Sequence, residues 1–188
     1  MISAGLPRRA ISDPLRQIRG FTLLELMVVV LIIGIITTFA SLSMGSRALD
    51  DQLENEAQRL NQVMSLAEDD AQAKGITIGF RQTTTGYDFL ATAQGGQWAS
   101  YAQSGPLRAR TLPDPMYMEL TVEGHALPPP TAGDGKKGSK IEPQILLLSS
   151  GEATAFSIKL GAHGLHAFYQ ITGNVLGTLS VAREGDSP

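Results

Sequence analysis

The pattern of apolar and polar positions divides the chain into a helical first part and a strand-rich remainder. The stretch 21–40 is apolar almost throughout and carries a single charge, at Glu25. About 20 helical residues, rising about 1.5 Å each, span about 30 Å, the thickness of the hydrocarbon core of a bilayer. The pattern therefore predicts a hydrophobic transmembrane helix over residues 21–43.

Beyond this segment, apolar residues recur every three or four positions, which is the spacing of one helical face. These positions are Leu49, Leu53, Ala57, Leu60, Met64, Ala67 and Ala71. Asp70 and Lys74 form an i,i+4 pair outside this stripe, and Gly75 is a typical helix stop. We expect the helix to continue as an amphipathic segment over 44–75. Its stripe is better suited to packing on a globular domain than to a coiled coil with a partner.

From residue 76 onward the apolar period changes to two, which indicates strands. Alternating segments occur at 76–80, 87–91, 116–122, 156–160, 165–171 and 175–181, with a weaker candidate at 97–101. The continuous apolar run 145–148 predicts a strand buried on both faces, and Ser150-Gly151, Gly161 and Gly173-Asn174 read as turns. Short strands without long helices between them predict an antiparallel sheet or sandwich. The fold class is therefore α+β, with a β-rich globular domain over 76–188.

Residues 124–140 interrupt the strand rhythm. They combine prolines, glycines and lysines and contain almost no side chain that could join a core. We expect a long flexible loop here, of a length that is usually functional or disordered.

Charge orients the first segment. Residues 1–20 hold four of the 15 basic residues of the chain and one acid, whereas acids follow the apolar stretch. The positive-inside rule then places the N-terminus in the cytoplasm and the globular domain outside it. A plain signal anchor and a secretory signal peptide cut near Ala40 both fit so far. Neither explains Glu25, because a carboxylate in an apolar span usually has a partner.

Candidate chemistry is sparse. The chain has no cysteine, which excludes disulfides, thiolate zinc sites and a cysteine nucleophile. His163 and His166 fall in a strand pattern, would point to opposite faces and lack further ligands, so they read as surface residues. The lysines in 136–140 read as a solubilising cluster, and Trp98 and Tyr101 as core-filling aromatics. No known catalytic or nucleotide-binding motif is present. We therefore expect no enzyme, no metal and no cofactor.

The string RGFTLLELM, from Arg19 to Met27, resembles the processing motif of type IV prepilins. In that family a dedicated aspartyl peptidase cuts after the glycine on the cytoplasmic side of the membrane and methylates the new N-terminus. The resemblance implies cleavage after Gly20, methylation of Phe21 and removal of 1–20 as a cytoplasmic leader peptide. It also implies that Glu25 pairs with the N-terminus of a neighbouring subunit during assembly.

The remainder resembles the H-type minor pseudopilins of the type II secretion system. The pairing of Ile145–Glu152 with Phe156–Leu160 looks like the family's hairpin, and Tyr169–Val181 looks like its final strands. The resemblance implies a pilin-like fold, in which a two-sheet antiparallel β-domain packs on the C-terminal half of the long helix. Major pseudopilins of this class carry a calcium site near the C-terminus. Glu184 and Asp186 are the only acids after Glu152, so we expect no such site here.

The same resemblance implies a structural role at or near the tip of the periplasmic pseudopilus, assisting export of folded proteins across the outer membrane. The implied location is the inner membrane, in a single pass, with a cytoplasmic N-terminus and a periplasmic globular domain. The implied partners are other minor and major pseudopilins, the prepilin peptidase, the inner-membrane assembly platform, and the exported protein or the secretin.

Two alternatives come from other classes. One is a FimT-like minor pilin of a type IV pilus that binds DNA, which would need exposed arginines or lysines on the globular part. The chain beyond residue 20 is acidic overall and its tail, 183–188, has one arginine, which argues against nucleic acid as a partner. The other is a membrane-anchored enzyme, for which no catalytic constellation is present.

Overall fold

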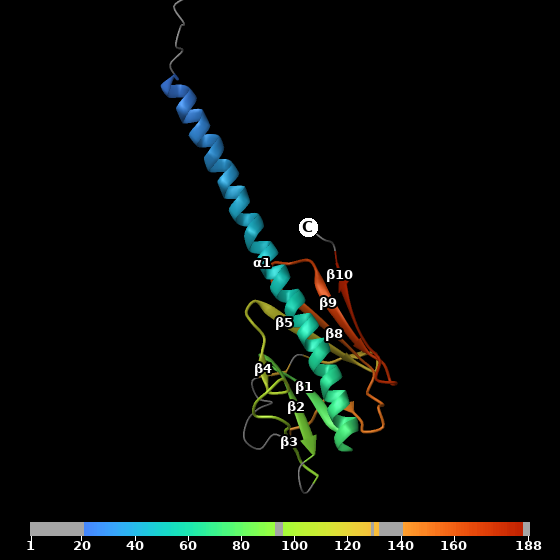
Figure 1. Cartoon of the computed structure of the whole chain (residues 1–188). Coiled ribbons are helices and arrows are strands. Elements are labelled where there is room, and N and C mark those ends of the chain that lie inside the picture. The colour runs from blue at the N-terminus through green and yellow to red at the C-terminus, as the bar shows by residue number, and fades with distance from the viewer. Residues whose placement is uncertain (1–20, 93–95, 129, 132–140, 186–188) are drawn as a thin grey trace, which may run out of the picture. The chain divides into compact units, whose positions relative to one another are not determined.

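In the computed structural model, one long helix, α1 (Leu23–Lys74), precedes all the strands (Figure 1). The structure describes residues 21–92, 96–128, 130–131 and 141–185, and the side chains of 39–46 lie outside that description. The chain divides into two units, 1–42 and 43–188.

In the first unit, α1 begins after Thr22, whose hydroxyl oxygen accepts a hydrogen bond of 3.2 Å from the backbone N–H of Glu25. Threonine is a favoured N-cap residue because it satisfies one of the free N–H groups of the first turn. Among the described residues, no helix is both long and apolar enough to count as a membrane-crossing span. The last residues of the span expected over 21–43 lie outside the described side chains.

In the second unit, the predicted apolar stripe of α1 is confirmed as the centre of the core. Leu53, Ala57, Leu60, Met64, Ala67 and Ala71 are all buried, whereas Leu49, the first predicted position of the stripe, is only half-buried. The helix ends at Lys74, and Gly75 follows with a φ of 65°, a conformation that glycine adopts readily. The expected helix stop is therefore confirmed.

The first sheet runs in the order β3-β2-β1-β7, with β4 also paired to β2. Its strands are β1 (Ile78–Thr83), β2 (Gly86–Thr92), β3 (Trp98–Ser100), β4 (Arg110–Thr111) and β7 (Ile145–Leu147). β1 and β2 form a hairpin, with Thr83 opposite Gly86 at its turn. In β7, Ile145 and Leu147 are buried but Leu146 is only half-buried, so this strand is fully buried on one face alone.

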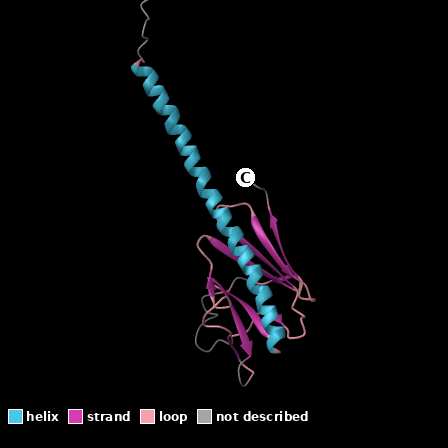
Figure 2. Cartoon of the chain, viewed as in Figure 1, coloured by secondary structure: helices cyan, strands magenta, loops and turns pink. Residues whose placement is uncertain are grey.

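The second sheet is antiparallel throughout and runs in the order β10-β9-β8-β5-β6. Its strands are β5 (Met116–Val122), β6 (His125–Ala126), β8 (Phe156–Ala162), β9 (Phe168–Gly173) and β10 (Leu179–Glu184). Buried residues of both sheets join the helix stripe in one core cluster. The expected α+β arrangement of a helix on two antiparallel sheets is thus observed (Figure 2).

The hairpin expected between Ile145–Glu152 and Phe156–Leu160 is wrong. A short turn does bring Leu147 opposite Ala153, and the N–H of Thr154 donates to the carbonyl of Leu146 at 2.9 Å. The chain then crosses to the other sheet, so β7 pairs with β1 while β8 pairs with β5 and β9. A strand has only two hydrogen-bonding edges, and both edges of β8 are already used.

Gly161 does not form a turn either. It lies inside β8 opposite Tyr117, and a β-carbon at this position would come within 2.6 Å of the Tyr117 ring. The turn comes later, at Gly164, with a φ of 97°. His163 and His166 therefore lie in the β8–β9 connection rather than in a strand.

Two further boundaries differ from expectation. The final strand begins at Leu179 rather than 175, because Asn174 caps a turn: its side-chain oxygen accepts hydrogen bonds of 3.0 Å from the N–H groups of Leu176 and Thr178. The loop expected over 124–140 opens with β6, which pairs with β5. Residues 129 and 132–140 lie outside the described structure.

Polar side chains flank the apolar stripe of α1 on both sides, and each side forms an ion pair with a different sheet. On one flank, Glu56 pairs with Arg110 of β4. On the other flank, Asp50 accepts a hydrogen bond of 2.8 Å from Arg183 of β10. The part of α1 in the second unit therefore lies across both sheets, with the apolar stripe between its two polar flanks.

Candidate functional site

The predicted processing and assembly residues cluster at the start of α1. Gly20 lies outside the described residues. Phe21 precedes the helix and is 71% exposed. Glu25 is exposed in the first helical turn, four residues after Phe21. The structure thus places the two described members of the predicted site at one helix end.

The cap at Thr22 determines how Glu25 is presented. Because the Glu25 N–H donates to the Thr22 hydroxyl, the helix starts here and its first turn carries the carboxylate. An acid in the first turn is favoured by the helix dipole. Within the described residues the Glu25 carboxylate has no hydrogen-bond or ion-pair partner, so it is available to a group from outside the chain. Thr22 was not foreseen as the cap, although its spacing to Glu25 is that of a capping box.

The helix that follows Glu25 is apolar on all its faces. Its large side chains are between 41% and 77% exposed, namely Leu23, Leu24, Leu26, Met27, Val28, Val29, Val30, Leu31, Ile32, Ile33, Ile35 and Ile36. A helix that is hydrophobic all round is normally buried, either in a protein core or in a membrane. Among the described residues of the first unit, nothing covers this surface.

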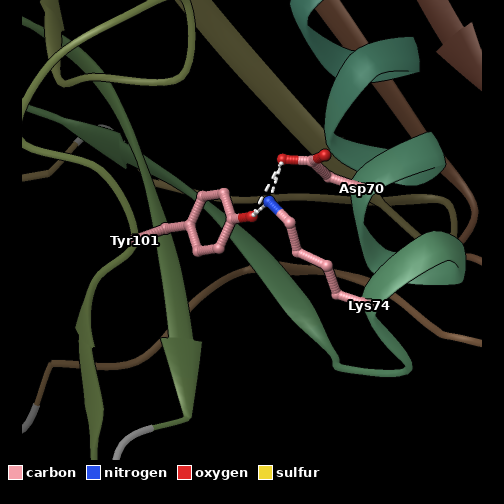
Figure 3. Close-up of polar contacts among 3 residues, drawn as sticks. All are labelled: Asp70, Lys74 and Tyr101. Atoms are coloured by element: carbon pink, nitrogen blue, oxygen red, sulfur yellow. Dashed lines mark hydrogen bonds and ion pairs between the residues drawn. The ribbon is translucent and has the colours of Figure 1, made fainter.

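A second polar cluster lies in the other unit, at the last turns of α1 (Figure 3). The hydroxyl of Tyr101 donates to the carboxylate of Asp70 at 2.8 Å and accepts from the ammonium group of Lys74 at 2.5 Å. The Asp70–Lys74 ion pair, at 2.9 Å, confirms the expected i,i+4 contact. Hydrogen bonds from Lys74 and then Tyr101 lower the pKa of Asp70. Tyr101 was not foreseen in this cluster, because local spacing carries no signal for a contact across 31 residues.

This cluster borders a groove of about 460 Å³ between the helix and the segment after β3. Its lining is mixed: the polar Asp70, Lys74, Tyr101 and Ser104 alternate with the apolar Leu66, Ala102, Pro106 and Leu107. The charged groups satisfy one another, and the groove holds no nucleophile next to a base.

Other titratable groups do not assemble into a reactive site. Both histidines of the β8–β9 connection are exposed, and His163 stacks against Tyr117 with ring centres 5.0 Å apart. In the part of the chain that the structure describes, no three acidic, histidine or cysteine side chains are placed to share a metal ion. Glu68 is a buried acid, and burial, followed by the charge of Asp69, raises its pKa.

Five of the basic side chains that the structure describes on the second unit pair with carboxylates of the same chain. Ion pairs join Lys74 with Asp70, Arg81 with Asp88, Arg110 with Glu56, Lys159 with Glu119, and Arg183 with Asp50. A protein that binds DNA needs free cations to displace the counterions of the phosphate backbone.

Comparison with known proteins agrees with the position of the processing motif. Residues 15–41 match a family model described as the prokaryotic N-terminal methylation motif. This match covers the predicted cleavage point, Glu25 and the exposed apolar part of α1.

Relatives extend the similarity over most of the chain. The type II secretion system protein H of Pseudomonas aeruginosa is 34% identical over 156 residues, covering 80% of this chain and 87% of the relative. The protein of the same name from Aeromonas hydrophila is 29% identical over 147 residues, covering 75% and 79%.

A solved structure supports the fold. The crystal structure of the minor pseudopilin EpsH from the type II secretion system of Vibrio cholerae superposes with a TM-score of 0.60. It is 20% identical and covers 71% of this chain and 97% of that one. At this identity the likeness supports the shared fold alone.

Proposed function

Because this chain belongs to the type II secretion system protein H family of minor pseudopilins, we propose that it acts at or near the tip of the periplasmic pseudopilus. There it assists the export of folded proteins across the outer membrane. Its role is structural: it works by assembling with other subunits, not by catalysing a reaction.

The observation that carries this proposal is the exposed apolar surface of α1 from Leu23 to Ile36. Before assembly, this segment anchors the protein in the inner membrane in a single pass, with the β-domain in the periplasm. After assembly, the helices of neighbouring pseudopilins cover it. Both environments remove apolar side chains from water, at about 25 cal/mol per Å² of buried apolar surface.

The first helical turn supplies the specificity of assembly. The prepilin peptidase cuts after Gly20 and methylates the new amino group of Phe21. The Thr22 cap leaves Phe21 outside the helix and presents the unpaired Glu25 carboxylate on its first turn. A charged amino group of a neighbouring subunit is a natural partner for this carboxylate, since an unpaired charge in apolar surroundings is costly.

The proposed partners follow from this role. They are other minor and major pseudopilins in the filament, the prepilin peptidase during maturation and the inner-membrane assembly platform during insertion. The exposed β-domain is the part available to the exported protein or to the secretin.

Mass spectrometry of the protein isolated from its native membrane tests the maturation step first. We expect a mature chain that starts at Phe21 and carries one added methyl group. An uncut Met1, or a start at Ser41, would instead indicate a plain anchor or a secreted protein and would overturn the proposal.

Tip location needs a separate test. Gold labelling of an epitope tag on the β-domain should mark the ends of isolated pseudopili, and deletion of the gene should reduce secretion of the exported proteins. Label spread evenly along the filaments would contradict the tip location while leaving membership of the filament intact.

A further inference from the structure

Strand β10 is the outermost strand of the second sheet and is six residues long (Figure 1). The other strands that border a sheet, β3, β4, β6 and β7, have only two or three residues each. A terminal strand exposes a row of backbone N–H and C=O groups that a further strand can bind. Among these strands, β10 therefore offers the longest edge for such pairing.

The register between β10 and β9 shows which backbone groups of β10 face outward. In the turn before β10, the N–H of Asn174 donates to the carbonyl of Thr178 at 3.2 Å. Hydrogen-bonded pairs recur at every second residue of an antiparallel ladder. The residues of β10 that continue this series towards β9 are Ser180, Ala182 and Glu184. The residues whose backbone groups point away from β9 are Leu179, Val181 and Arg183. Within the described residues, no hydrogen bond reaches these outward groups.

The centre of this edge lacks the usual protection against pairing. Native proteins protect edge strands with charged side chains, prolines or bulges. The central residues of β10 are the uncharged Ser180, Val181 and Ala182, and the register with β9 contains no bulge. Arg183, near the end of the edge, is held on Asp50 of the helix. The edge is therefore suited to lasting cover by a second chain.

The two faces of β10 define the strand that fits beside it. Leu179 and Val181 are half-buried and pack on the core cluster. The exposed side chains on the other face are those of Ser180, Ala182 and Glu184. Side chains of an added strand would lie next to both rows in alternation. That strand should therefore place apolar residues on the core side and polar residues on the solvent side. A lysine or arginine near Glu184 would complement its charge, since Glu184 has no ion-pair partner within the described residues.

We propose that the free edge of β10 binds an amphipathic strand of a different pseudopilin, so that the second sheet continues from this chain into its neighbour. The partner is a different pseudopilin because a minor subunit has other pseudopilins as its neighbours. An exported protein passes only transiently, whereas an unprotected edge needs lasting cover. Main-chain hydrogen bonds supply the binding, and the alternating side chains supply the selectivity. This inference rests on the proposed role in the pseudopilus and names one contact surface within it.

Photocrosslinking in cells that assemble pseudopili detects the contact. The full chain carries the photoreactive amino acid p-benzoylphenylalanine in place of Ala182, which is exposed on β10. We expect a cross-link to a strand of another pseudopilin of the same secretion system, identified by mass spectrometry of the linked peptides. The control places the same amino acid at Glu119, which is exposed on β5 in the interior of the same sheet. The control should give several-fold less product.

Val181→Pro in the same background tests the main-chain hydrogen bonds. Proline removes the outward N–H of Val181 and is tolerated in an edge strand where that N–H faces solvent. The matched control, Val181→Thr, has nearly the same shape and keeps the N–H. We expect Val181→Pro to reduce the cross-linked product several-fold and Val181→Thr to leave it nearly unchanged. Thermal unfolding shows whether the β-domain of each variant remains folded.

Charge reversal provides a second arm that does not depend on the backbone of β10. Glu184→Lys should also reduce the product several-fold, because it would repel the basic residue expected on the partner strand. Glu152→Lys, at an exposed acid in the turn after β7, is its control and should have little effect. If Val181→Pro does not fold, this pair of variants decides the outcome.

The contact is overturned by a yield no higher than at Glu119, or by cross-links only within the chain, to a second copy or to an exported protein. A yield that neither Val181→Pro nor Glu184→Lys lowers would overturn it as well. N-terminal mass spectrometry of the protein in sheared pseudopili separates this failure from that of the proposed function. Chains that start at Phe21 and enter pseudopili without the cross-link refute the edge contact only, whereas unprocessed chains refute the proposed function.

Discussion

The carboxylate of Glu68, in α1, lies directly against the α-carbon of Gly177, in the turn between β9 and β10. A β-carbon at position 177 would overlap the Glu68 carboxylate and come within 2.6 Å of the carbonyl oxygen of Gly151. Gly177 also has a φ of 74°. This contact brings the helix, the turn after β7 and the last turn of the second sheet together at one point.

Gly177→Ala should therefore destabilise the fold through two effects. The positive φ costs a residue with a β-carbon about 1–2 kcal/mol. Overlap with Glu68 and Gly151 should add about 1–3 kcal/mol, as in other overpacked sites. Urea unfolding of the full chain in detergent measures the sum.

Gly124→Ala is the matched control, because Gly124 has a similar φ of 81° but no atom within 4 Å of the added β-carbon. It should show the conformational cost alone. Equal losses of stability in the two variants would mean that the Glu68 side chain moves away from the added β-carbon at little cost.

Glu68→Gln should change how stability depends on pH. Burial, and then Asp69, raise the pKa of Glu68 above its ordinary value of 4.5 in the folded chain. Between the ordinary and the raised pKa, the folded state binds more protons than the unfolded state, so wild-type stability falls as pH rises through this window. Glutamine does not titrate. The stability of the variant relative to the wild type should therefore increase as the pH rises from 4 to 7.

Thermal unfolding of both proteins at the two pH values measures this difference. The comparison at pH 4 serves as the internal reference, because Glu68 is then largely protonated in both states. If the stability difference between Glu68→Gln and the wild type is the same at both pH values, the pKa of Glu68 is not raised in the folded chain.

Leu60→Ala should be severely destabilising. Leu60 is 1% exposed at the centre of the helix stripe, and removing a buried leucine side chain typically costs about 2–5 kcal/mol. Leu66→Ala, on the same helix but 36% exposed, should cost far less. If chemical denaturation gives the two variants equal midpoints, α1 is not packed on the sheets as described.

Tyr101→Phe should cost about 0.5–1.5 kcal/mol, since it removes the hydroxyl that joins Asp70 and Lys74 while keeping the ring. Tyr117→Phe is the control: its hydroxyl has no hydrogen bond within the described residues, so the change should be nearly neutral. The denaturant midpoints of the two variants, compared with that of the wild type, measure the contribution of the Tyr101 hydroxyl to stability. A neutral Tyr101→Phe would show that the cluster contributes nothing measurable to stability.

Glu25→Val should leave the stability of the β-domain unchanged, because Glu25 lies in the other unit and makes no side-chain bond there. Incorporation into the pseudopilus should fall sharply. Both are measurable, by thermal unfolding and by the amount of the protein in sheared filaments at native expression. Normal secretion and normal incorporation in this variant would remove Glu25 from the assembly role.

Most of the secondary structure could be predicted from local patterns. The stripe from Leu53 to Ala71 and the alternation in β5 follow directly from which side chains avoid water, so both predictions were confirmed. Such a pattern shows that a segment forms a helix or a strand, but it does not show which other strand the segment pairs with. For the same reason these patterns could not show that β7 and β8 belong to different sheets.

The candidate site divides in the same way. Phe21 and Glu25 can be recognised from the residues next to them in the sequence. The start of α1 also depends on a neighbour, because the cap residue is Thr22. Tyr101 and Arg183 meet the helix across long separations, 31 residues to Asp70 and 133 residues to Asp50. No spacing in the sequence indicates such contacts.

Local side-chain patterns were enough to predict the processing motif, the long helix with its apolar and amphipathic parts, and most of the longer strands. These depend on side-chain chemistry and on periods of about 3.6 and 2 residues, which act within a single element. Which strands share a sheet, and where the flanks of the helix meet each sheet, became visible only in the folded chain. Both features depend on which strand edges form hydrogen bonds with each other and which surfaces pack together. Residues far apart in the sequence make these contacts, so they form only when the whole chain folds.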